Sequence, residues 1–108
     1  MKHFDDYNLD NKSTIDRLLK DNWYVFCNTK KEMQLLLMVC NKAGLKWNSG
    51  EEPFKYRPDE PPPAYIAYGK EEAALFYYTK SDMRFWWDAG YMLDIENLTD
   101  WFFHSIQK

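Results

Sequence analysis

The sequence predicts a single compact α+β domain with a mostly antiparallel sheet of four to five strands and two to three helices. Its 108 residues are close to the commonest size of one domain. Short segments rich in β-branched and aromatic residues follow one another in the second half of the chain with brief connections, which favours antiparallel pairing. Capping patterns indicate helices, and we expect the helices to cover one face of the sheet.

The N-terminal part of the chain divides into a polar segment and a first helix. Residues 1–12 are polar and irregular, so the folded domain is expected to occupy residues 13–108. Ser13 opens a capping pattern with Asp16 at the third helical position, and apolar residues follow at helical spacing. These signals predict a helix over about 13–21.

A strand and the longest helix are expected next. Residues 23–27 are β-branched and aromatic with apolar side chains on both faces, which predicts a central strand. Thr29 and Glu32 form the clearest capping box of the chain, and Gly44 can adopt the left-handed conformation that ends a helix. We therefore expect a helix from Thr29 to about Ala43.

This expected helix has one apolar stripe and two apolar residues outside it. Leu35 and Met38 lie off the stripe. They are either covered by another element or exposed as an apolar patch, and the second alternative makes them candidates for binding a partner. The stripe itself consists of Met33, Leu36, Leu37, Cys40 and Ala43.

The middle of the chain combines a short strand, a proline-rich connection and a hairpin. We expect the short strand over 45–47. Residues 51–63 contain all five prolines, which predicts a stiff, exposed connection. Residues 64–68 and 73–78 are expected to form two strands joined by a four-residue hairpin turn. The connection is acidic because it contains Glu51, Glu52, Asp59 and Glu60.

The C-terminal part is expected to hold a short helix, a strand and a final helix. Ser81 can cap a helical segment over 82–88. Apolar alternation then predicts a strand over 91–95. The final helix is expected over 98–107, and its cap is either Asn97 or Thr99.

Charge and cysteine content argue against several classes of protein. Fourteen basic and 17 acidic residues give a net charge of −3 without a basic stripe, which argues against direct nucleic-acid binding. Cys27 and Cys40 lie in apolar runs and are expected to be buried, reduced thiols. The longest apolar run, residues 35–40, is far shorter than a membrane span, and residues 1–6 lack the apolar core of a signal peptide. We expect a cytoplasmic protein that does not bind membranes.

No pattern in the sequence indicates catalysis, a metal site or a cofactor. His3 and His104 lie at opposite ends of the chain without the spacing of metal ligands. Cys27 and His104 could meet as a nucleophile and base, but the apolar surroundings expected for Cys27 disfavour a thiolate. The acidic pairs lie in loops beside Lys or Arg, as is typical of solvated surfaces. The sequence therefore predicts a protein that is not an enzyme.

Aromatic residues are the most unusual feature of the chain: five Trp, eight Tyr and seven Phe. In the runs 85–87 and 101–103, successive helical side chains diverge by about 100°, so three cannot all enter one core. Trp, Tyr and Arg dominate binding hot spots. Phe103 is expected on a different side of its helix from Leu98, Trp101 and Phe102. The main candidates for binding a partner are therefore Tyr78, Arg84, Phe85, Trp86 and Trp87, joined by Phe103.

Residues 44–50, Gly-Leu-Lys-Trp-Asn-Ser-Gly, resemble a Gly-x-Lys-Trp-x-Ser-Gly turn that recurs in small proteins of phages and mobile elements of Gram-positive bacteria. In those proteins a strand and a helix precede the turn, and a Tyr-rich hairpin and a Gly-Tyr strand follow it. The resemblance covers about residues 23–95, apart from the insert 51–63. It implies an accessory phage protein with no catalytic residues to carry over. Small acidic phage proteins of this kind often resemble inhibitors of host defence, including anti-CRISPR proteins.

Two functions are compatible with the sequence. The first is a non-catalytic accessory protein that binds a host protein or ribonucleoprotein and blocks an antiviral system. Its aromatic residues would anchor the partner, and the acidic connection 51–60 would face a basic partner surface. The second is a small-ligand protein that holds a nucleotide signal between aromatic rings in a concave pocket. The surplus aromatics could also form a homodimer.

Overall fold

The computed structural model describes residues 4–53, 62–90 and 95–108 and confirms an α+β fold with a mostly antiparallel sheet. Within these ranges the sheet order is β3-β2-β1-β4. β1 pairs antiparallel with β2 and parallel with β4, and β2 pairs antiparallel with β3. The predicted central position of β1 is confirmed. The strands are β1 (Trp23–Cys27), β2 (Ala64–Gly69), β3 (Ala74–Tyr78) and β4 (Glu96–Asn97).

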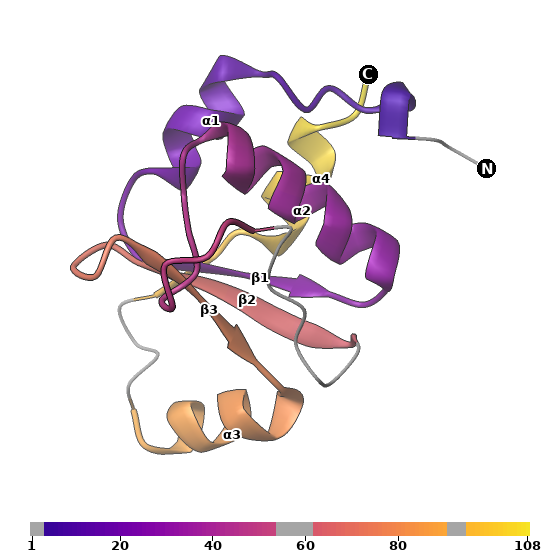
Figure 1. The fold of residues 1–108 in the computed structure, drawn as a ribbon. Helices are drawn as coiled ribbons and strands as arrows, with labels where there is room; N and C mark the ends of the chain where they lie inside the picture. The colour runs from indigo at the N-terminus through magenta and orange to yellow at the C-terminus, as the bar shows by residue number, and fades with distance from the viewer. Residues whose placement is uncertain (1–3, 54–61, 91–94) are drawn as a thin grey trace.

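Helices cover both faces of this sheet. Figure 1 shows α1, α2 and α4 on one face and α3 on the other. The expectation that all helices pack on one face is therefore wrong. Helices are needed on both sides of the sheet because both faces of β1 carry apolar side chains that have to be covered. The helices are η1 (Phe4–Asp6), α1 (Lys12–Leu18), α2 (Lys30–Lys42), α3 (Lys80–Asp88) and α4 (Thr99–Ser105).

The main core lies between the sheet and helices α1, α2 and α4. Burying an aromatic or aliphatic side chain completely stabilises the fold by about 1.5–3 kcal/mol. The buried indole of Trp23 also satisfies its polar atom, because its Nε1–H donates to the carbonyl oxygen of Leu18 at 2.9 Å. The most deeply buried members of this core include Leu18, Trp23, Val25, Leu36, Val39, Ile66, Leu75, Phe102 and Ile106.

The long helix α2 has the predicted cap at Thr29, but the second bond of the predicted capping box goes to Asn28 and not to Thr29. The Thr29 side chain accepts the backbone N–H of Glu32 at 3.1 Å. Glu32 in turn accepts the backbone N–H of Asn28 at 2.7 Å. Gly44 follows the helix at a φ of +80°, as the left-handed ending requires.

Leu35 and Met38 of α2 do not form an exposed apolar patch. Leu35 is only 2% exposed and belongs to the main core together with Leu9 and Leu18 from the N-terminal part of the chain. Met38 is half-buried and packs against the same core. The alternative that another element covers these residues is therefore correct for Leu35, whose assignment as a partner-binding candidate is wrong, whereas the assignment of the half-buried Met38 stays a prediction.

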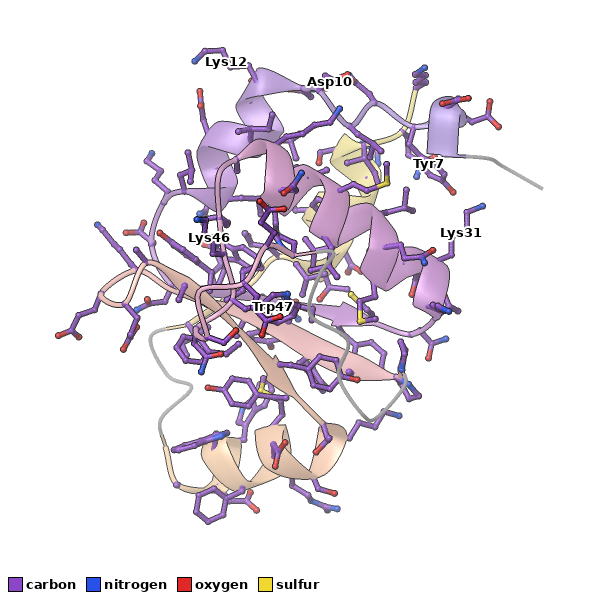
Figure 2. All side chains as sticks on the ribbon, viewed as in Figure 1. Tyr7, Asp10, Lys12, Lys31, Lys46 and Trp47 are labelled. Atoms are coloured by element: carbon purple, nitrogen blue, oxygen red, sulfur yellow. The ribbon has the colours of Figure 1, made fainter. Side chains whose placement is uncertain are left out.

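The N-terminal segment is more ordered than expected. It contains η1, and Tyr7 forms an isolated antiparallel bridge with Gln107. The Lys31 ammonium of α2 lies 5.6 Å from the centre of the Tyr7 ring (Figure 2). Helix α1 begins one residue before the predicted Ser13, because Asn11 is its cap and accepts the N–H groups of Ser13 and Thr14. These contacts join the two ends of the chain beside α2.

The expected strand 45–47 is a single bridge. Trp47 pairs with Leu75 in parallel, and the N–H of Leu75 donates to Lys46 at 2.8 Å. Trp47 is a buried member of the main core (Figure 2), and its Nε1–H donates to the Pro53 carbonyl at 3.0 Å. This segment therefore lies along the outer edge of β3.

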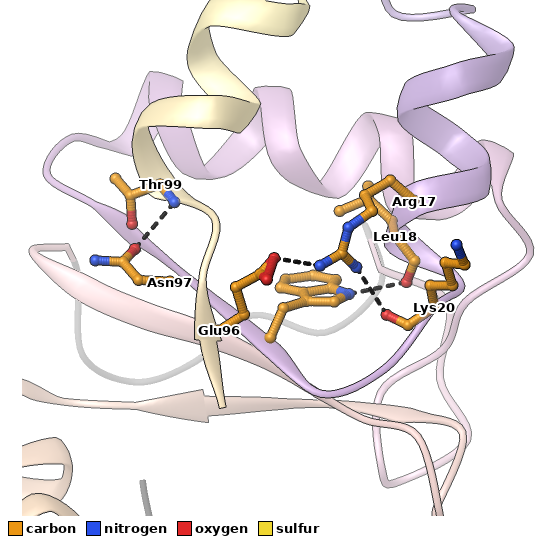
Figure 3. A network of polar contacts seen from close by, with 7 residues as sticks. Arg17, Leu18, Lys20, Glu96, Asn97 and Thr99 are labelled. Atoms are coloured by element: carbon orange, nitrogen blue, oxygen red, sulfur yellow. Dashed lines mark hydrogen bonds and ion pairs between the residues drawn. The ribbon is translucent and has the colours of Figure 1, made fainter. Parts of the chain in front are cut away.

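The C-terminal elements are shorter than predicted. Residues 91–94 of the expected strand lie outside the described residues, and β4 begins at Glu96. Asn97 accepts the N–H of Thr99 at 3.0 Å, just before α4 begins. Figure 3 shows how Arg17 of α1 holds this region, because its guanidinium contacts the Glu96 carboxylate and donates to the Lys20 carbonyl.

The burial of Leu35 predicts the effect of its removal on stability. Leu35→Ala should lower the free energy of unfolding by about 2–5 kcal/mol, because a cavity remains in the core. Met38→Ala, at a half-buried site on the same helix, should cost about 1 kcal/mol. Urea unfolding followed by circular dichroism measures both. Equal, small losses for the two variants would contradict the position of Leu35 in the core.

Candidate binding surface

Helix α3 starts with a complete capping box. Thr79 accepts the backbone N–H of Asp82 at 3.1 Å, and the Asp82 carboxylate accepts the backbone N–H of Thr79 at 3.0 Å. The predicted cap, Ser81, instead lies within the first turn, so the helix begins two residues earlier than expected. Gly90 follows the helix at a φ of +83°. Local sequence signals therefore fix both ends of this nine-residue helix.

A single residue of α3 is buried, and it docks the helix on the sheet. Met83 is 1% exposed and packs in a small second core with Tyr24 and Ala67. Tyr65 and Tyr78 are partly buried against the same cluster. This second core lies on the opposite side of the sheet from the main core (Figure 1).

The aromatic run of α3 cannot enter this small core, as the helical geometry predicts. Phe85 is 64% exposed, Trp87 is 49% exposed and Trp86 is half-buried. Trp87 contacts the ring of Tyr24 edge-on, with ring centres 5.5 Å apart. The ring of Phe85 meets that of Trp86 at 5.4 Å. Large aromatic surface therefore remains accessible on the outside of the helix.

The structure brings together the five candidates from residues 78–87. Arg84 is exposed on α3, next to Phe85. Tyr78 at the end of β3 is half-buried, and its ring meets the edge of Trp86 at 6.3 Å. We call Tyr78, Arg84, Phe85, Trp86 and Trp87 the α3 surface.

The remaining candidates lie elsewhere. Phe103 is half-buried, packs against the main core and contacts Phe102 at 5.2 Å, so it lies on a different element from the α3 surface and its role in binding stays a prediction. Trp101 is the exposed member of that run, at 38%. Glu51 and Glu52 are exposed after Trp47. The last two candidates, Asp59 and Glu60, lie outside the described residues.

Sequence reasoning missed a cavity beside the α3 surface. It has a volume of about 340 Å³ and lies between the β2–β3 hairpin and Trp86. Phe76 and Tyr78 line it from alternate positions of β3, and Glu71 and Glu72 line it from the hairpin turn. The period-2 spacing of the two rings was a usable signal, but the position of α3 above them was not visible in the sequence.

The surroundings of Tyr78 show that this region carries negative charge. Burial raises the pKa of the Tyr78 hydroxyl, and the carboxylates of Glu72 and Asp82 raise that pKa further. Two negative charges close enough to act on the tyrosine disfavour its anionic form. An anionic ligand would meet the same repulsion.

The cysteines and histidine do not form a reactive pair. Burial, then the charge of Glu32, raises the pKa of the Cys27 thiol. Burial also raises the pKa of the Cys40 thiol. His104 is exposed on α4. Both cysteines are free and buried, as predicted. Among the described residues, no group of three His, Cys, Asp or Glu side chains could hold a metal ion.

No protein family, curated protein or solved structure matches this chain. None of the helices in the described parts of the chain is long and apolar enough to cross a membrane.

The burial of both thiols predicts their reactivity. In the native protein at pH 8, a disulfide reagent should modify Cys27 and Cys40 at least about tenfold more slowly than in urea, because the thiolate is disfavoured and shielded. The colour released by the reagent measures both rates. Rapid modification of one thiol in the folded protein would contradict its buried environment.

Proposed function

We propose that this chain is a non-catalytic accessory protein that binds a host protein or ribonucleoprotein through the α3 surface. The observation that carries the proposal is the exposure of Phe85 and Trp87, at 64% and 49%, on one short helix. Exposed aromatic residues together with an arginine are typical of a binding hot spot.

The packing of α3 supports this proposal. Met83 is the only buried residue of α3, and Phe85 lies about 200° around the helix from it, so docking the helix on the sheet does not require Phe85. Trp87 contacts the edge of Tyr24 although 49% of it is exposed, so its ring is already partly restricted before a partner arrives. A ring restricted in this way loses less conformational entropy on binding.

The resemblance of residues 44–50 to turns of phage and mobile-element proteins extends the proposal to origin and role. On this basis the partner is part of a bacterial antiviral system such as CRISPR-Cas, and the protein acts in the host cytoplasm. Inhibition would follow from occlusion of the partner's surface. The exposed Glu51 and Glu52 would favour a partner with basic residues nearby.

Replacing Phe85 or Trp87 should weaken capture of the partner without unfolding the protein. In a pull-down from bacterial lysate, Phe85→Ala and Trp87→Ala should each weaken capture by about 30-fold, which corresponds to about 2 kcal/mol at a hot spot. Trp101→Ala is the matched control, because Trp101 is 38% exposed on α4, across the sheet. Thermal unfolding of each variant verifies the fold.

The same variants also distinguish binding of a host partner from formation of a homodimer. Equal capture by the wild type and both α3 variants would contradict the proposed surface. A mass that doubles with concentration in light scattering, and does so only when Phe85 and Trp87 are present, would make the surface a homodimer interface instead.

Binding of a small ligand is the second candidate function, and the cavity beside Trp86 favours it. A nucleotide signal would be a poor occupant of this particular cavity. Its phosphates would lie near the carboxylates of Glu71 and Glu72, and like charges repel most strongly away from bulk water.

A further inference from the structure

The cavity beside α3 has an aromatic wall made by residues from two elements. Phe76 and Tyr78 lie two positions apart on β3, and their ring planes are nearly parallel at 7°, with centres 6.2 Å apart. The Trp86 ring is inclined to that of Tyr78 by 62°. Rings in two orientations around one cavity present several electron-rich surfaces to an occupant.

Two exposed carboxylates also line the cavity. Glu71 and Glu72 both line it from the turn between β2 and β3. A Cβ atom at Gly69 would clash with the Glu72 carboxylate and lie 3.2 Å from the Phe76 ring. The Glu72 side chain therefore folds back over the strand, next to the aromatic wall.

Gly69 has no conformational reason to be glycine. Its φ is not in the left-handed region, unlike that of Gly44, Gly50 and Gly90. A glycine inside a strand marks a place where another group approaches the backbone closely. Here that group is the Glu72 carboxylate, which occupies the space that a Cβ atom would take beside the cavity.

No positive side chain neutralises this charge among the described residues that line the cavity. Lys70, the nearest cation along the chain, has its ammonium 3.6 Å from the Asp21 carboxylate. The raised pKa of Tyr78 is consistent with uncompensated negative charge at the aromatic wall. The cavity therefore combines three rings with two carboxylates.

We propose that this cavity binds an organic cation, either a guanidinium or a methylated ammonium group. Aromatic faces attract such weakly hydrated cations, and the carboxylates accept their remaining N–H groups. A metal ion would lack its usual shell of oxygen ligands against three rings. The site shares Tyr78 and Trp86 with the partner surface proposed above, but Phe85 and Trp87 do not line it.

Titration of the ¹⁵N-labelled full chain with matched pairs of probes tests the charge requirement. The cationic probes are the N-acetyl amides of arginine and dimethyllysine, and their neutral counterparts are the N-acetyl amides of citrulline and norleucine. At least one cation should cause saturable NMR shifts at the Gly69 amide and the Trp86 indole N–H. Its neutral counterpart should bind at least about tenfold more weakly.

Variants test the named residues. Glu72→Gln and Phe76→Leu should each weaken cation binding by about two- to fivefold, because each removes one attractive contact and keeps a similar shape. Glu51→Gln and Phe85→Leu are the matched controls and should leave the affinity unchanged. Phe85→Leu also distinguishes the two proposals, since it should weaken partner capture alone.

A second pair of probes identifies the source of the cation. A nine-residue peptide with the same cationic residue at its centre should bind at least about tenfold more tightly than the amide if the natural ligand is a protein side chain. Equal affinities would indicate a free small cation. The proposal is overturned if neither cation gives saturable shifts, if citrulline binds as well as arginine, or if the doubly substituted Glu72→Gln, Phe76→Leu chain binds normally.

Discussion

The central strand β1 has to be covered on both of its faces, and the other elements are arranged around that requirement. Trp23, Val25 and Cys27 belong to the main core, whereas Tyr24 belongs to the second. Three helices cover the first face, and α3 covers the second (Figure 1). Because α3 contributes only Met83 to the buried second core, most of its aromatic side chains remain at the surface. Covering the second face of β1 with α3 therefore leaves aromatic side chains of this helix accessible at the surface.

The same arrangement places both proposed sites, the α3 surface and the cavity beside Trp86, at helix α3. Trp86 faces the hairpin side of α3 and lines the cavity, while Phe85 and Trp87 do not. Phe85 and Trp87 offer exposed aromatic surface, whereas the cavity is a partly open space lined by three aromatic rings and two carboxylates. The proposed partner surface and the cavity share Tyr78 and Trp86 and differ in Phe85 and Trp87. Binding at one site would influence the other through Trp86, whose ring contacts both Phe85 and Tyr78.

Local signals predicted the elements well, and long-range packing set the limits of prediction. The capping box at Thr29 and the apolar content of residues 23–27 were sufficient for α2 and for the central strand. The burial of Leu35 depends on contacts with the N-terminal segment, whose polar sequence gave no sign of order. In the run 101–103, a helix starting at Thr99 buries Phe102 and leaves Trp101 exposed, which spacing alone did not resolve. The cavity was not foreseen because it forms between elements whose relative position is not encoded locally.

Proton–proton NOEs measure the position of α3 across the sheet from the main core. We expect contacts between the rings of Trp87 and Tyr24, and between those of Trp86 and Tyr78. We also expect that neither indole contacts Val25 or Phe102, which belong to the main core. NOEs from Trp86 or Trp87 to those two residues, with none to the tyrosines, would contradict this position of α3.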